Sequence, residues 1–96
     1  MVNNYEAVII VGPALEKEAL DKVVDDIKTL ISRHQGTVSQ VQPWGKKKLA
    51  YPIKKQNEGS YFLFDFTLAP LQVKKIEGLL KLNEALLRTL VIKKES

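Results

Sequence analysis

The sequence contains no cysteine among its 96 residues, and no long apolar run lies near its start. The missing thiols exclude disulfide scaffolds, thiolate metal sites and cysteine nucleophiles. The apolar run Ala7 to Val11 is far shorter than the ~20 residues that a membrane helix needs. A basic leader and a small-residue cleavage site, as in signal peptides, are also missing. We therefore expect a cytoplasmic protein with no membrane contact.

Groups that could carry out catalysis are scarce as well. His34 is the only histidine and follows the apolar stripe of a predicted helix, which suggests a helix-end residue near backbone carbonyls. Asp25 and Asp26 are adjacent, so on a helix their carboxylates diverge by about 100° and are best explained as solvated charge. The scattered glycines form no Walker or dinucleotide motif. The sequence predicts no catalytic residue, no metal, no cofactor and no small-molecule substrate.

What the chain does have is a moderate excess of positive charge. Fifteen Lys and Arg residues against eleven Asp and Glu residues give a net charge of +4, which favours polyanionic partners. The composition, 45% hydrophobic and 27% charged, is that of a globular protein. Because domains cluster near ~100 to 150 residues, we predict a single domain over residues 1–96.

The hydrophobic periodicity predicts the element order βαββαβ. The expected elements are, in order, a central strand Tyr5–Val11, an amphipathic helix from Leu15 to Gly36, a strand Thr37–Trp44 continued by Lys47–Ile53, a polar turn Lys54–Gly59, a strand Tyr61–Leu68, a helix after Pro70 and a strand Ala85–Lys93. Pro43 and Pro52 favour an edge strand, and Pro43 to Gly45 favours a bulge or interruption. Gly36 is expected to end the first helix through a positive φ.

Side-chain alternation predicts which residues form the core. In the third strand Phe62, Phe64, Phe66 and Leu68 are expected inside, opposite Tyr61, Leu63, Asp65 and Thr67. The helix stripes expected to face the sheet are Leu20, Val23, Val24, Ile27, Leu30 and Ile31, and then Leu71, Val73, Ile76, Leu79 and Leu80. Right-handed crossovers and one hairpin then give an α+β, ferredoxin-like fold, a four-stranded antiparallel sheet with two helices on one face. The other face is left open to a partner.

Two basic clusters are the strongest sign of a partner. Lys46, Lys47, Lys48, Lys54 and Lys55 are expected at the two ends of one strand, and Lys81, Arg88, Lys93 and Lys94 at the other strand-helix end. Such clusters can contact phosphates, although lysines on an edge strand also discourage edge-to-edge aggregation. The third strand lacks the basic, glycine and aromatic signature of RNA-recognition motifs. Base stacking, for which Tyr61 is the candidate, is therefore a minor hypothesis.

The stretch WGKKKLAYPI makes the prediction specific. Gly45, the basic pair Lys47 and Lys48, and Leu49 to Ile53 together resemble the signature of the family of ribosomal protein six of the bacterial small subunit. The resemblance extends over essentially the whole chain: further matches in the same order are Tyr5-Glu6, Gly12-Pro13, Gly36, and Arg88 followed by Leu90-Val91-Ile92-Lys93.

The resemblance implies a ferredoxin-like fold and a structural role without enzymatic activity. Members of this family bind the central domain of 16S ribosomal RNA together with ribosomal protein eighteen of the small subunit. By resemblance, Lys47, Lys48, Leu49 and Tyr51 belong to the strand surface that meets the protein partner and the adjoining RNA, and Arg88 lies at the RNA-facing end of the sheet. Lys46, Lys81, Lys93 and Lys94 are RNA-binding candidates on charge and position.

The sequence departs from many relatives at both ends. Asn3-Asn4 stands where basic residues often precede the first strand, and the chain stops at Ser96 without a long acidic tail, so functions of that tail are expected to be absent. Two alternatives remain: a stand-alone RNA-binding module, and a small enzyme of the acylphosphatase type. The enzyme needs an arginine in the loop after the first strand, and Gly12-Pro13-Ala14-Leu15 has none.

Overall fold

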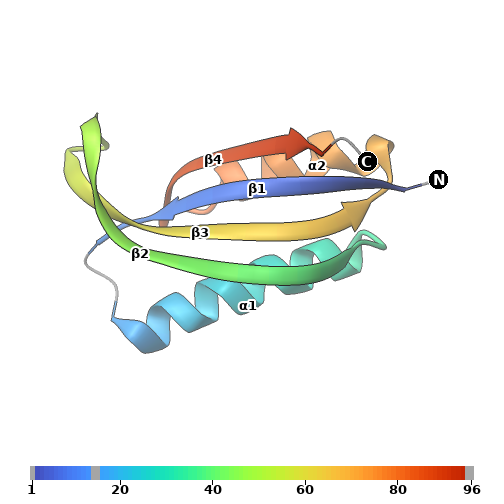
Figure 1. Ribbon diagram of the computed structural model, residues 1–96, viewed down its shortest axis with the longest axis horizontal. Coiled ribbons are helices and arrows are strands. Elements are labelled where there is room, and N and C mark those ends of the chain that lie inside the picture. Colours follow the sequence, from blue (N-terminus) through green and yellow to red (C-terminus); the bar gives the residue numbers. More distant parts are fainter. Residues whose placement is uncertain (1, 14–15, 95–96) are drawn as a thin grey trace.

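The computed structural model describes residues 2–13 and 16–94 (Figure 1). Its elements are β1 (Asn3–Val11), α1 (Lys17–Arg33), β2 (Thr37–Ile53), β3 (Gln56–Leu68), α2 (Pro70–Lys81) and β4 (Leu86–Lys93). The predicted order βαββαβ is confirmed. The predicted start of the first helix at Leu15 lies outside the described residues. No helix in the described ranges has the length and apolar character to cross a membrane.

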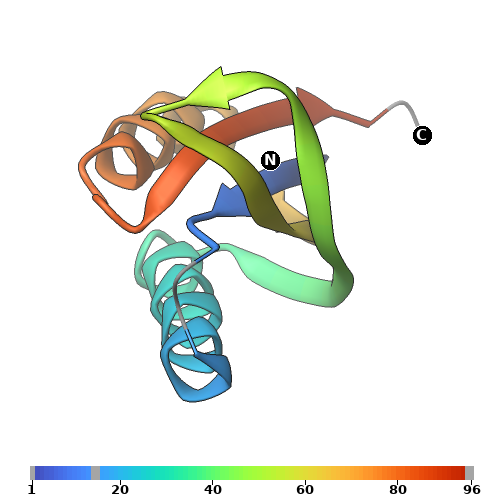
Figure 2. The same ribbon diagram turned by 90° about the vertical axis from the view of Figure 1, so that its left-hand side faces the viewer.

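The four strands form one sheet in the order β2-β3-β1-β4, and every neighbouring pair is antiparallel. Both helices lie on the same side of this sheet (Figure 2). The predicted ferredoxin-like fold is thereby confirmed, with β1 in the centre and β2 at an edge. We call the side without helices the open face.

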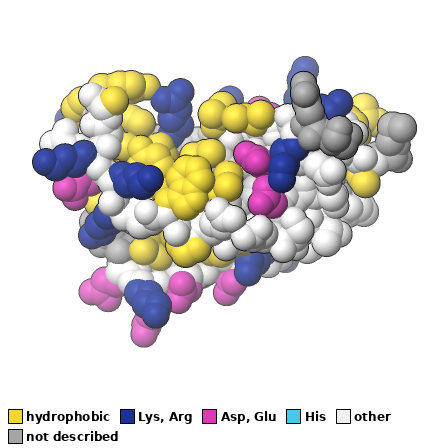
Figure 3. Space-filling view, in the orientation of Figure 1, with side chains coloured by type: hydrophobic (Ala, Val, Ile, Leu, Met, Phe, Trp, Pro, Cys, Tyr) yellow, Lys and Arg dark blue, Asp and Glu magenta, His cyan; other side chains and the backbone are white. Residues whose placement is uncertain are grey.

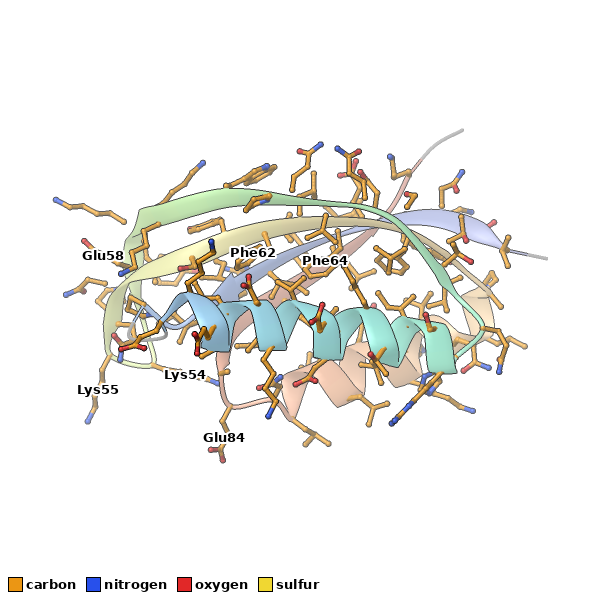
Figure 4. The ribbon with its side chains drawn as sticks, turned by 90° about the horizontal axis from the view of Figure 1, so that it is seen from below. Lys54, Lys55, Glu58, Phe62, Phe64 and Glu84 are labelled. Atoms are coloured by element: carbon orange, nitrogen blue, oxygen red, sulfur yellow. The ribbon has the colours of Figure 1, made fainter. Side chains whose placement is uncertain are left out.

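The core lies between the sheet and the helices. Tyr5 of β1 and Phe66 of β3 stack with ring centroids 5.8 Å apart. Phe64 is fully buried, and Figure 4 shows it with Phe62 between the sheet and α1. The predicted facing of the third strand is therefore confirmed. The helices contribute the buried residues Val23, Ile27, Ile31, Ile76 and Leu80.

The end of α1 differs from the prediction for Gly36. The helix ends at Arg33, and Gln35 takes the positive φ, at 62°. The amides of Gln35 and Gly36 donate to the carbonyl oxygens of Ser32 and Ile31, which is the Schellman arrangement with glutamine in the usual glycine position. Gly36 instead provides space, because a Cβ there would lie 2.8 Å from the Thr67 carbonyl oxygen.

The predicted stripe of α2 is wrong at two positions. Val73, Ile76 and Leu80 face the core, whereas Leu71 is 88% exposed and Leu79 is 42% exposed. Each residue of a helix is rotated by about 100° from the one before it. Leu71 is therefore nearly opposite Val73, and Leu79 lies at the margin of the stripe that contains Leu80.

The turn between β2 and β3 is shorter than predicted. Only Lys54 and Lys55 form it, both with positive φ, at 50° and 66°, and Gln56 already pairs with Ile53. The polar residues 56–59 belong to β3 rather than to a turn. Their polarity reflects a hairpin that extends beyond the sheet into solvent, which a search for apolar alternation cannot detect.

Candidate nucleic-acid and protein interface

The β2–β3 hairpin extends beyond the ends of β1 and β4 (Figure 1) and curls over the open face (Figure 2). Figure 3 shows hydrophobic side chains gathered at the centre of the open face, with Lys and Arg side chains beside them on the hairpin side. The exposed apolar residues of β4 on this face are Leu90 and Ile92. The open face thus combines an apolar centre with a basic border.

A bulge in β2 shapes the first part of this border. The pairing register with β3 shifts between Pro43 and Gly45, and Gly45 has φ 81°, which confirms the predicted bulge. The bulge leaves Trp44 exposed, and the Lys47 ammonium lies 5.2 Å from the centroid of its ring. The same ammonium lies 5.7 Å from the ring centroid of Tyr61, within cation–π range of both rings.

Trp44 was not among the predicted site residues. The signal for it was present in the sequence, since a tryptophan within a proline-glycine bulge cannot follow the regular alternation of a strand. Sequence reasoning missed it because alternation does not specify toward which face a bulged residue turns.

The three consecutive lysines divide between the two sides of β2. Lys46, Lys47 and Lys48 pair with Ser60, Gly59 and Glu58, and successive strand residues point to opposite faces. Lys47, which contacts Tyr61, therefore lies on the open side, whereas Lys46 and Lys48 point to the other side. The register with β3 shifts between Lys48 and Ile53, and within this segment Tyr51 reaches the open side, where it contacts Arg88. Leu49 is half-buried and Tyr51 is 57% exposed.

Arg88 of β4 contacts this hairpin. Its Nη1 donates a hydrogen bond of 2.7 Å to the Tyr51 hydroxyl. Close by, Lys54 Nζ donates to the carbonyl oxygen of Leu86 over 3.1 Å. Residues from the two opposite edges of the sheet are therefore brought together on the open face.

The predicted second basic cluster does not form as one group. Arg88 pairs with Ile10 and Lys93 pairs with Tyr5, so these two positions lie about 17 Å apart along an extended strand. Lys81 ends α2, five residues before β4 begins, on the Arg88 side. The prediction erred because it grouped these residues by proximity in the chain.

Lys94 lies at the other end of the open face, next to two carboxylates. Its Nζ is 3.2 Å from Asp65 Oδ1 and 3.7 Å from Glu6 Oε1. The hydrogen bond to Asp65, assisted by the attraction of both carboxylates and partly opposed by desolvation, raises the pKa of Lys94 above its usual 10.5. The ammonium of this RNA-binding candidate is thus already compensated by two negative charges.

A candidate metal site is not found in the ranges 2–13 and 16–94. No group of three or more His, Cys, Asp or Glu side chains gathers there to hold a metal ion. His34 has the helix-end position that was predicted, with Nδ1 2.9 Å from the Leu30 carbonyl oxygen.

Comparisons with known proteins agree with this geometry. Residues 4–93 match the family model described as ribosomal protein S6. The small ribosomal subunit protein bS6 of Heliobacterium modesticaldum is 38% identical over 94 residues, covering 98% of each chain. That of Microcystis aeruginosa is 41% identical over 93 residues, covering 97% of this chain and 72% of the relative. The crystal structure of 30S ribosomal protein S6 from Thermotoga maritima superposes with a TM-score of 0.91 at 25% identity, covering 98% of this chain and 89% of that one.

Proposed function

The chain belongs to the ribosomal protein S6 family, components of the cytoplasmic small ribosomal subunit, and from this premise we propose that it binds 16S ribosomal RNA together with ribosomal protein eighteen of the small subunit. The proposed binding site on the RNA is the central domain of 16S ribosomal RNA. The chain acts as one domain over residues 1–96, without catalytic activity, cofactor, metal or small-molecule substrate, as a structural component of the particle.

The observation that carries this proposal is the two-sided character of β2. On one side Lys46 and Lys48 extend into solvent, where long cationic side chains can neutralise phosphates. On the other side Tyr51 adds exposed apolar surface to the open face, and its half-buried neighbour Leu49 is assigned with it, which suits a protein neighbour. One strand can therefore contact RNA and protein at once.

The roles proposed for the remaining candidate residues rest on their positions in the fold. Arg88 and Lys81 lie toward the hairpin end of the sheet and are assigned to the RNA border, with Lys93 as a separate contact at the opposite end. Lys47 is assigned to the junction of the two partners, since its ammonium lies over aromatic rings on the open side. Lys94 is the weakest RNA candidate because Asp65 and Glu6 already compensate its charge.

Cross-linking in assembled subunits tests the proposal. A tagged copy incorporated into small subunits is irradiated with ultraviolet light for RNA contacts and treated with a lysine-reactive reagent for protein contacts. We expect residues 46–55 to cross-link to the central domain of 16S RNA and to ribosomal protein eighteen. RNA cross-links without that protein neighbour support the stand-alone RNA-binding module instead, and cross-links to neither contradict the proposal.

A further inference from the structure

The outer half of the β2–β3 hairpin has no strand pairing with β1 or β4. Pairing between β1 and β3 ends at Val11 and Ser60, so residues 56–59 of β3 pair only with β2. A two-stranded ribbon on its own is marginally stable in water. Its curled position therefore depends on contacts outside the strand ladder.

Two side-chain contacts with β4 supply this support. Arg88 Nη1 donates to the Tyr51 hydroxyl at 2.7 Å, and Lys54 Nζ donates to the Leu86 carbonyl oxygen at 3.1 Å. Both donors are charged, which strengthens a hydrogen bond relative to a neutral pair. The two contacts connect β2 and its turn to the strand at the opposite edge of the sheet.

The burial of Ile10 shows how closely the hairpin approaches the open face. Ile10 points to this face, yet only 6% of it is exposed. A Cβ on Gly59 would overlap Ile10 Cγ2 and lie 3.2 Å from the Val11 carbonyl oxygen, so the ribbon can approach this closely only with glycine at position 59.

The residues of the turn also indicate that the hairpin is held against β4. Lys54 and Lys55 both have positive φ, where asparagine and glycine are the usual residues of a two-residue hairpin turn. Lysine is unusual at position 54, and its side chain there reaches the carbonyl oxygen of Leu86. Figure 4 shows Lys55, in contrast, pointing away from the molecule.

From these contacts we propose that Arg88 and Lys54 are positioning residues, which hold the hairpin over the open face so that Tyr51 is in place before the protein partner arrives. The inference rests on the proposed function for the identity of that partner, ribosomal protein eighteen. Its physical basis is preorganisation, since a surface that is already ordered loses less conformational freedom on binding. Arg88 then contributes to protein capture, separately from any phosphate contact.

Amide hydrogen exchange in the free protein tests the positioning without any partner. Tyr51→Phe removes only the hydroxyl, and Arg88→Met removes the donor. Each should raise the exchange rates of hairpin amides 46–59 about fivefold, the factor that one lost hydrogen bond corresponds to. Because both variants break the same contact, the double variant should exchange no faster than either single one.

Two controls accompany these variants. Lys93→Met removes one positive charge from the far end of β4, and Lys55→Met removes one from the turn without touching β4; neither should change hairpin exchange. Amides in the centre of β1 should keep their protection in every variant, which verifies the fold. Unchanged hairpin exchange in both Tyr51→Phe and Arg88→Met overturns the inference.

Capture of purified ribosomal protein eighteen is the second arm. Tyr51→Phe should weaken capture several-fold while leaving the salt dependence of RNA binding unchanged, because no charge is removed. Faster hairpin exchange with full capture overturns the link between positioning and binding. If the unmodified chain itself fails to capture the partner, the proposed function fails, and the exchange measurements alone decide whether Arg88 positions the hairpin.

Discussion

Lys94 provides the clearest test of electrostatics at the scale of one residue. Its pKa lies above 10.5 in the folded protein because Asp65 and Glu6 favour the ammonium form. A raised lysine pKa contributes stability that is fully present below pH 10.5 and is lost as the pH rises through the higher folded value.

Lys94→Gln should therefore be less stable than the unmodified protein at neutral pH, and the difference should shrink above pH 10.5. Urea melts of both proteins between pH 7 and pH 12 measure this difference, in which titrations common to both chains cancel. A difference that stays constant up to pH 12 would mean that the Asp65 contact is not formed in solution.

Phe64 and Asp65 are neighbours that test the facing of β3. Phe64→Ala leaves a cavity between the sheet and α1 and should lower the free energy of unfolding by about 3 to 5 kcal/mol. Asp65→Ala removes a surface ion pair and also relieves the carboxylate of Glu6 directly opposite, so its cost should stay below about 1 kcal/mol. Urea denaturation compares the stability losses of the two variants. A larger loss for Asp65→Ala would mean that β3 turns its other face to the helices.

At the scale of the elements, two glycines have contrasting roles in and after helices. Gly78 lies inside α2, and a Cβ there would meet no described atom within 4 Å beyond its chain neighbours and the backbone of its own helix. Gly78→Ala should stabilise the protein by about 0.5 to 1 kcal/mol through helix propensity alone.

At Gly36 a Cβ would lie 2.6 Å from Ile31 Cγ2 and 2.8 Å from the Thr67 carbonyl oxygen. Gly36→Ala should therefore destabilise by about 1 to 3 kcal/mol, as overpacking does. Thermal denaturation of the two variants gives shifts of opposite sign, and a stabilised Gly36→Ala would show that space is not what glycine provides there.

The elements also show what the sequence could predict. The four strands and the facing of β3 were predicted because burial on one side imposes alternation, as Phe64 and Phe66 against Asp65 illustrate. The motif around Lys47 to Tyr51 led to the right family because the resemblance is carried by residues that are consecutive in the sequence. The curl of the hairpin and the contact between Tyr51 and Arg88 were not predictable, since they join residues 37 positions apart across the whole sheet.

For the whole molecule, the phosphate contacts proposed for β2 can be separated from its proposed protein contacts by charge. Replacing Lys46 and Lys48 together by alanine should reduce the slope of log RNA affinity against log salt by up to ~1.8, at ~0.9 per duplex contact. Replacing Lys22 and Lys28 of α1 removes the same charge from another element and should leave the slope nearly unchanged. Equal effects of the two double variants, in filter binding over a salt series, would mean that only net charge matters.

Joint recognition is the central claim, and RNA binding with and without the protein partner tests it most directly. A surface with a net charge of +4 makes few phosphate contacts, so the isolated chain should bind a fragment of the 16S central domain weakly and with strong salt dependence. With ribosomal protein eighteen seated on the open face, affinity for the same fragment should rise by at least about tenfold, an ordinary coupling of ~1.4 kcal/mol between two binding events. Equal RNA affinity with and without that protein, measured by filter binding at one salt concentration, would contradict the account.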